Sequence, residues 1–183
     1  DALRYIDLVG EFRDSYAYTN FGLTAAAEGV AHAMGMEWHE LGEQWLFTPA
    51  GMTQTSFLHS DLIGREDRAV GHVRQGDAWV HAFDRQPDAQ APAGGVSSSV
   101  RDLAQWMRLQ LRDGALNGEL LVDEQALGET HLPHAFTGLT NESFRQIPGF
   151  YGLGWNLGYD ETKTVTLSHS GAFLYGAATS VYL

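Results

Sequence analysis

A tyrosine and an amide stand two residues apart near the start of the sequence, at Tyr18 and Asn20, just ahead of an alanine-rich stretch. At a helix entrance, both side chains can point into one cleft. A phenol there can exchange a proton with a reacting group, and an amide can donate a hydrogen bond to a substrate carbonyl. The structural alternative is that Tyr18 is a core aromatic and that Asn20 is an N-cap.

A second polar group, His169-Ser170-Gly171, lies near the other end of the sequence, in a run typical of a strand. Glycine there allows a substrate to approach the strand closely. The alternative for His169 is a strand histidine hydrogen-bonded within the fold. Elsewhere His131 and His134 bracket Pro133, which breaks the helix that would align two ligands. We therefore predict no metal site and no cofactor.

Composition limits the classes of function. A net charge of -12 over 183 residues argues against nucleic acid or an anionic membrane surface as partners, because both need clustered Lys and Arg. The absence of cysteine excludes a disulfide framework, a thiolate nucleophile and Cys-ligated zinc, and leaves the localisation open. No apolar run is long enough to span a bilayer. With 44% hydrophobic residues, the chain can bury a core.

The elements that would position these residues are helical at first. Apolar residues at helical spacing, Gly and Pro stops, and the capping-box pattern Ser99-x-x-Asp102 mark the helices. We predict helices over residues 2–12, 24–34, 37–47, 99–112 and 123–129. The first of these should turn Leu3, Ile6, Leu8 and Val9 toward a core.

Strand patterns follow. Turn residues at Gln75-Gly76-Asp77 predict a small hairpin with strands near 69–74 and 78–83. Strand-like runs with tight turns predict an antiparallel meander over 151–159, 164–169 and 176–183. We therefore expect an α+β fold, with a mainly helical region with a small hairpin over 1–150 and the antiparallel strands of a truncated sheet over 151–183.

Several segments resemble the penicillin-recognising serine hydrolases, which include class C β-lactamases, D,D-carboxypeptidases, D-aminopeptidases and related esterases. Four matches follow the order of the family's motifs across nearly the whole chain. They are Tyr18-Thr19-Asn20-Phe21-Gly22 (the Tyr-x-Asn region), Trp45 to Met52 (a helix ending in Pro-x-Gly-Met), Ala91 to Ser99 with Asp102, Leu103 and Trp106 (the Gly-Gly-x-x-Ser helix entry), and His169-Ser170-Gly171 (a variant of the Lys-Thr-Gly strand).

The resemblance implies a β-lactamase/transpeptidase-like fold, as part of one domain that is incomplete at both ends. It also implies a serine hydrolase that forms an acyl-serine intermediate from an amide or ester substrate. The family takes its nucleophile from Ser-x-x-Lys, and this sequence contains none. Its one lysine, Lys163, follows Asp160 at that spacing, and Ser98 is followed by Arg101. We therefore expect a fragment that lacks the nucleophile, with the missing N-terminal part of the same enzyme as a possible partner.

By the same resemblance, Tyr18 would exchange protons with the serine and the leaving group, and Asn20 would donate to the substrate's amide carbonyl. His169 and Ser170 would line the substrate strand, Gly171 would allow close approach, and the backbone N–H of Ala172 would be an oxyanion donor.

Histidine at 169, where class C β-lactamases have lysine, lacks a fixed positive charge at neutral pH. This favours a peptidase, aminopeptidase or esterase over an enzyme for β-lactam carboxylates. The alternative function is a non-catalytic binding module for peptides or cell-wall fragments that keeps the cleft without the nucleophile.

Overall fold

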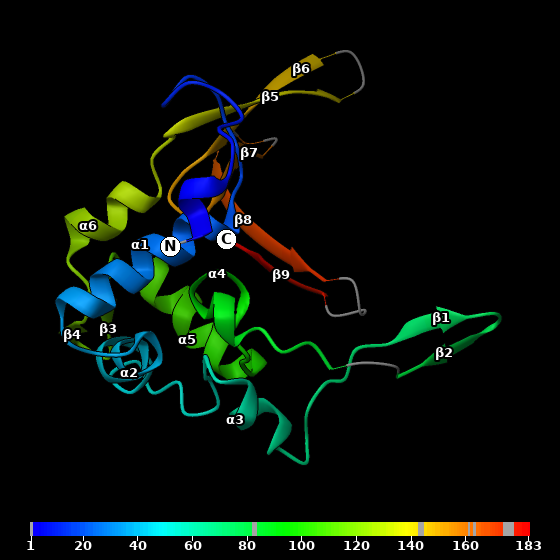
Figure 1. Cartoon of the computed structure of the whole chain (residues 1–183). Helices are drawn as coiled ribbons and strands as arrows, with labels where there is room; N and C mark the ends of the chain where they lie inside the picture. The colour runs from blue at the N-terminus through cyan, green and yellow to red at the C-terminus, as the bar shows by residue number, and fades with distance from the viewer. Residues whose placement is uncertain (1, 82–83, 143–144, 161, 163, 174–177) are drawn as a thin grey trace.

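The computed structural model of the chain describes residues 2–81, 84–142, 145–160, 162, 164–173 and 178–183. Helices lie to one side of an antiparallel sheet, and the N-terminal segment runs beside the first strands of that sheet (Figure 1). The hairpin β1–β2 projects away from both. Among the described residues, no helix combines the length and apolar character needed to cross a membrane.

The helical elements in chain order are η1 (Ala2–Tyr5), α1 (Asn20–Ala33), α2 (Trp38–Gly42), the π-helical η2 (Glu43–Phe47), α3 (His59–Ile63), η3 (Asp88–Gln90), α4 (Ala91–Gly94), α5 (Val100–Gln110) and α6 (Glu124–Thr130). The strands are β1 (Val73–Gln75), β2 (Ala78–Val80), β3 (Ala115–Leu116), β4 (Glu119–Leu120), β5 (Ala135–Glu142), β6 (Arg145–Tyr151), β7 (Asn156–Tyr159), β8 (Val165–Ala172) and β9 (Ala178–Tyr182).

Helix α1 begins earlier than its apolar spacing predicts, and its cap is a different residue. Thr19 is the N-cap: its Oγ1 accepts a hydrogen bond from the backbone N–H of Gly22 at 3.4 Å. Asn20 is therefore the first residue of the helix and not its cap. The helix ends at Ala33 with Met34 as its C-cap, and Gly35 follows with a φ of 68°, the left-handed conformation that commonly closes a helix.

The prediction of a helix over 2–12 is wrong. Only η1 forms there, and its apolar side chains do not reach a core: Ile6 is 55% exposed and Leu8 is 89% exposed. Apolar spacing alone cannot specify a helix when no partner surface covers the apolar stripe, because most helical stability in proteins comes from packing.

The first core lies among the helices. Its buried members are Phe47, Ala50, Met52, Phe57, Ala91, Leu109 and Leu116. The rings of Phe47 and Phe57 stack with centroids 5.1 Å apart. Gly42 allows this arrangement, because a Cβ at that position would lie 2.4 Å from the Phe57 ring. This core holds the end of η2, helix α4 and helix α5 together.

Among the described residues, five strands form an antiparallel sheet in the order β5-β6-β7-β8-β9. The sheet begins at Ala135, ahead of residue 151, where the sequence led us to expect the first of its strands. Strand β5 carries Gly138 and strand β6 carries Pro148 and Gly149, and these residues weaken the strand pattern. The run 151–159 is not one strand: β6 ends at Tyr151 and a turn precedes β7.

The predicted hairpin forms, but its first strand begins only at Val73, and the remaining predicted helices fall close to their expected positions. Strands β1 and β2 pair around Gly76-Asp77, and α6 begins after Asp123, whose Oδ1 accepts from Ala126 N at 2.9 Å. The predicted strand ends at 82–83 and 176–177 lie outside the described residues.

A second core, formed by Trp155, Leu157 and Leu167, lies on the sheet. Trp106 of α5 packs against this core and also against the core among the helices. This half-buried indole therefore joins the two layers.

The buried carboxylate of Asp102 ties the segment after η2 to helix α5. Its Oδ2 accepts hydrogen bonds from Gln54 N at 2.7 Å and from Thr55 Oγ1 at 2.8 Å. The expected capping box is therefore only half formed. Ser99 Oγ accepts from Asp102 N at 3.2 Å, but the Asp102 side chain turns to Gln54 and Thr55.

We expect Asp102→Ala to lower the free energy of unfolding by about 3 kcal/mol, because two donors lose a charged acceptor in a buried site. The matched control Asp123→Ala removes an exposed N-cap and should cost about 1 kcal/mol. Urea denaturation of both variants measures the difference. Equal losses would contradict the role assigned to Asp102.

Candidate functional site

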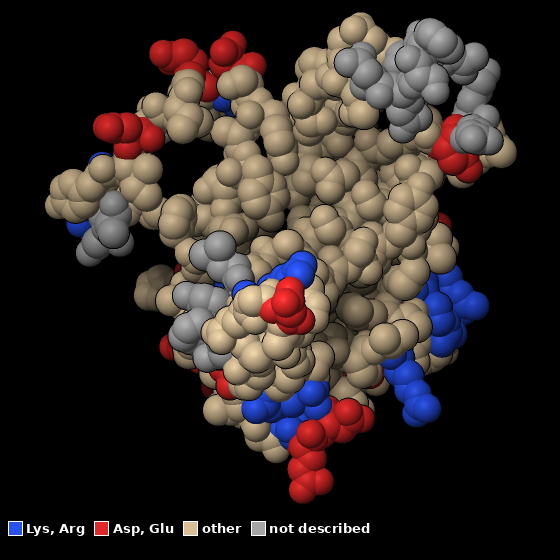
Figure 2. All heavy atoms as spheres, turned by 90° about the vertical axis from the view of Figure 1, so that its right-hand side faces the viewer, with Lys and Arg blue, Asp and Glu red and all other residues tan. Residues whose placement is uncertain are grey.

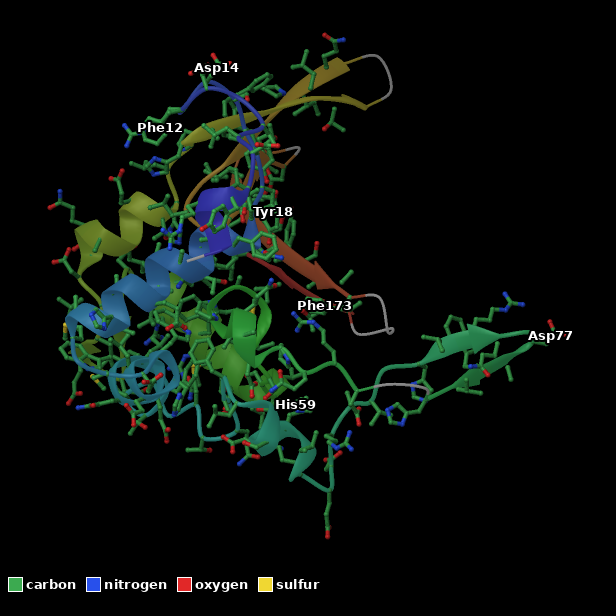
Figure 3. All side chains as sticks on the ribbon, viewed as in Figure 1. Phe12, Asp14, Tyr18, His59, Asp77 and Phe173 are labelled. Atoms are coloured by element: carbon green, nitrogen blue, oxygen red, sulfur yellow. The ribbon has the colours of Figure 1, made fainter. Side chains whose placement is uncertain are left out.

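Tyr18 belongs to the extended segment just before α1. Its side chain is 56% exposed, so it is not the core aromatic of the structural alternative. The N-cap at Thr19 fixes the start of helix α1. It therefore also fixes the position of Tyr18, the residue just before the cap. Figure 3 shows the Tyr18 ring close to β8, which comes from the other end of the sequence.

His169 lies in the second half of β8 and is half-buried. Its Nδ1 lies 2.6 Å from the carbonyl oxygen of Gly154, in the turn between β6 and β7. The Tyr151 hydroxyl lies 3.5 Å from the same nitrogen. The imidazole is therefore held by a backbone group on a neighbouring turn.

The structure brings these side chains into one aromatic group. The Tyr18 and His169 ring centroids are 6.5 Å apart. Tyr151 meets Tyr18 edge-on at 6.1 Å and lies 6.4 Å from His169. Tyr16 packs against Tyr151 with ring centroids 5.4 Å apart. The two segments singled out at opposite ends of the sequence therefore meet around a third residue, Tyr151.

A cleft of about 570 Å³ opens over this group. Its lining residues are Ser15, Tyr16, Ala17, Tyr18, Thr19, Leu23, Ala93, Ala135, Tyr151, Gly152, Leu153, Gly154 and His169. None of these described residues is Asp, Glu, Lys or Arg. On the face shown in Figure 2, uncharged residues dominate the upper middle, whereas charged side chains lie at the edges, in the lower part and in one small group near the centre. The cleft is thus uncharged in a strongly acidic chain.

The strand that carries His169 has one open side. Strand β7 pairs with β8 only as far as Asn156 opposite Ser168. On the other side, β9 pairs with β8 through Ala172. In the described part of the chain, no strand therefore pairs with the stretch from His169 to Ala172 on the β7 side. Backbone groups that point to this side can bond to a ligand.

The remaining predicted residues lie close by but do not line the cleft. Asn20 is half-buried in the first turn of α1, where its carbonyl accepts from Thr24 Oγ1 at 2.8 Å. Ser170 is exposed, since neighbouring side chains of a strand point to opposite faces. Gly171 and Ala172 pair with Thr179 and Ala178. The roles assigned to these four residues stay predictions.

The two histidines considered for a metal turn to separate partners. His131 Nε2 lies 2.8 Å from Gln110 Oε1, and burial lowers the pKa of His131. His134 Nε2 lies 2.9 Å from the carbonyl oxygen of Glu129. Within the described ranges, no group of three His, Asp or Glu side chains is placed to hold a metal ion.

Tyr151 is the site residue that sequence reasoning missed. It opens the run Tyr151-Gly-Leu-Gly-Trp155, which resembles the start of a strand but is the end of β6 followed by a turn. The available signal was the placement of glycines between aromatic residues, which is more typical of a turn or a close backbone approach than of a strand interior.

Burial, together with the nearby Tyr18 and Tyr16 hydroxyls, raises the pKa of Tyr151 from 10.0 to about 12. Burial and Tyr18 also raise the pKa of Tyr16. Both phenols are therefore protonated at neutral pH and can donate a hydrogen bond there.

The raised pKa of Tyr151 predicts a loss of stability in alkali. The contribution is fully present below pH 10 and is lost as the pH rises to about 12, because the unfolded chain ionises first. Tyr151→Phe should lose less stability over this range than the wild type, whereas Tyr159→Phe, an exposed control, should match the wild type. Urea denaturation across this pH range measures the effect. Parallel curves for all three proteins would contradict the prediction.

The model of the Beta-lactamase family matches residues 1–183. No match was found among curated protein sequences.

Solved structures share the fold at low identity. The octameric penicillin-binding protein homologue from Pyrococcus abyssi matches with a TM-score of 0.70 and 20% identity, over 90% of this chain and 35% of that chain. A β-lactamase from Sulfitobacter sp. EE-36 gives 0.64 and 19%, over 91% and 50%. The D-alanine carboxypeptidase AmpC from Burkholderia cenocepacia gives 0.63 and 18%, over 91% and 51%.

The chain thus spans between 35% and 51% of the length of these three structures. The α+β architecture predicted from the sequence is confirmed as the β-lactamase/transpeptidase-like fold. Because the family model covers the whole sequence, the chain belongs to the β-lactamase family.

Proposed function

We propose that this chain supplies the substrate cleft of a serine hydrolase that cleaves an amide or ester through an acyl-serine intermediate. The observation that carries the proposal is the meeting of Tyr18 and His169, with ring centroids 6.5 Å apart at one cleft. These residues come from opposite ends of the sequence, and each belongs to a segment that matches a family motif.

The nucleophile in this proposal comes from polypeptide outside the sequence. Acyl transfer needs a nucleophile, a base and donors for the oxyanion. The sequence holds no Ser-x-x-Lys, and the nearest substitute, Ser98 with Arg101, offers a guanidinium that stays charged and cannot accept a proton. A segment with Ser and Lys would complete the cleft beside Tyr18.

Tyr18 is the proton carrier in the proposed mechanism. A free phenol titrates near pH 10, so at neutral pH it needs a neighbouring cation to give up its proton. The lysine of the added segment would be that cation. Tyr18 would then take the proton of the serine hydroxyl and return it to the leaving group.

The open side of β8 suits the rest of the mechanism. The backbone N–H of Ala172 would share the oxyanion with the N–H of the absent serine. Asn20 would hold the substrate's amide carbonyl, and Ser170 would line the strand that faces the substrate. Gly171 would allow the substrate backbone to approach.

The uncharged cleft bears on the substrate. His169 stands where class C β-lactamases carry lysine, and no described lining residue is Arg or Lys. A substrate carboxylate would therefore lack a fixed positive partner in this part of the site. This favours a peptidase, aminopeptidase or esterase over a β-lactamase.

The second candidate is a binding module that holds peptides or cell-wall fragments without cleaving them. The absence of Ser-x-x-Lys from this sequence favours it, and the cleft is the same in both cases. The two differ in the residues encoded ahead of Asp1. A Ser-x-x-Lys there supports the enzyme, and its absence supports the binding module.

We expect the chain alone to give no turnover of nitrocefin or a p-nitrophenyl ester above background, because its sequence contains no Ser-x-x-Lys. A protein in which this chain follows a family segment with Ser-x-x-Lys should hydrolyse the ester. The serine-to-alanine form of that segment is the control. Turnover by the chain alone would show that another nucleophile exists.

In the nucleophile-bearing protein, Tyr18→Phe should lower kcat by about 10²–10⁴-fold, the usual contribution of general acid–base catalysis. Tyr159→Phe is the matched control, because both side chains are 56% exposed. Ester hydrolysis under saturating substrate measures the change. Equal activity of the two variants would remove Tyr18 from the mechanism.

A further inference from the structure

The turn between β6 and β7 carries a backbone oxygen into contact with His169. Gly154 in this turn has a φ of 97°, which L side chains rarely adopt. Two hydrogen bonds anchor the turn: Gly152 N donates to Trp155 O at 2.8 Å, and Leu153 N donates to Thr130 O at 3.1 Å. The carbonyl of Gly154 is therefore fixed in place, 2.6 Å from Nδ1 of His169.

A carbonyl oxygen can only accept a hydrogen bond, so Nδ1 must carry the proton. The Tyr151 hydroxyl, at 3.5 Å, can then offer only its oxygen to the same N–H. A neutral imidazole has one N–H, and the other nitrogen keeps a free lone pair. In this geometry the nitrogen with the lone pair is Nε2.

We propose that Gly154 is a positioning residue whose carbonyl fixes His169 in the Nδ1–H form, so that neutral His169 serves the cleft as a hydrogen-bond acceptor through Nε2. The identity of the group that donates to Nε2 rests on the proposed function, because that group would belong to the substrate of the hydrolase. A lysine at this position can only donate. The substrates selected by His169 are those that present an O–H or N–H to Nε2, and not those that present a carboxylate.

Glycine at 154 provides a sharp test. A Cβ there would meet no described atom within 4 Å, so Gly154→Ala would act through the backbone conformation and not through a clash. Gly118, in the turn between β3 and β4, has a φ of 89° and is equally open. Gly118→Ala therefore imposes the same kind of strain away from the cleft.

The first measurement is the nitrogen NMR spectrum of the histidine rings of this chain, at a pH where imidazole is neutral, with His169→Gln to assign the signal. We expect His169 to show a protonated Nδ1 and an unprotonated Nε2. Gly154→Ala should lose this preference, and Gly118→Ala should keep it. A protonated Nε2 in the wild type, or no change in Gly154→Ala, would overturn the proposal.

The second measurement tests the substrate class in the nucleophile-bearing protein. Two p-nitrophenyl esters of equal length are compared, one ending in a hydroxyl and one in a carboxylate. The wild type should prefer the hydroxyl ester, and His169→Lys should shift the ratio of kcat/KM toward the carboxylate ester by at least about tenfold.

The two proposals fail in different ways. Hydrolysis of both esters with a ratio that His169→Lys leaves unchanged overturns the acceptor role and leaves the hydrolase intact. No hydrolysis of either ester overturns the hydrolase, while the NMR spectra still decide whether Gly154 sets the ring's protonation.

Discussion

The indole of Trp106 packs against both apolar cores, and the geometry of the cleft depends on this double contact. Tyr18 leads into a helix of one layer, whereas His169 belongs to the sheet. Contacts between aromatic rings contribute only about 0.5–1.5 kcal/mol each. These contacts are modest, so we infer that the packing that joins the helices to the sheet contributes to the Tyr18–His169 distance as well.

The charged side chains of this acidic protein lie outside the described lining of the cleft. The chain carries a net charge of -12, yet the described lining of the cleft contains only neutral side chains and titratable Tyr and His. Burial and the neighbouring Tyr18 and Tyr16 hydroxyls raise the pKa of Tyr151, and no carboxylate is among the causes of this shift. Proton transfer by Tyr18 would therefore depend on a cation brought by another segment.

Much of the architecture could be predicted from the sequence. The helix start at Ser99 and the hairpin turn at Gly76 were predictable because each depends on local chemistry. The order of the matched motifs indicated the family. The helix predicted over 2–12 failed because its apolar residues have no surface to cover. The start of the sheet at Ala135 was missed because Pro148 and the glycines of β5 and β6 hide the alternating pattern.

The site was predictable only in part, and for a related reason. Tyr18 and His169 could be chosen by residue type and motif, and the structure brings their rings together. Tyr151 and the Gly154 carbonyl could not be chosen this way. One is an aromatic in an apparent strand, and the other is a backbone atom whose direction depends on a φ of 97°.

The projecting hairpin β1–β2 has a practical consequence (Figure 1). Its turn at Gly76-Asp77 lies away from the sheet, and neither residue belongs to either core or to the cleft lining. Exposed loop tips of this kind tolerate added sequence. A peptide tag or a reporter domain inserted between Gly76 and Asp77 should leave the residues of the cleft in place. The hairpin is therefore a suitable site for attaching this protein to a surface or a probe.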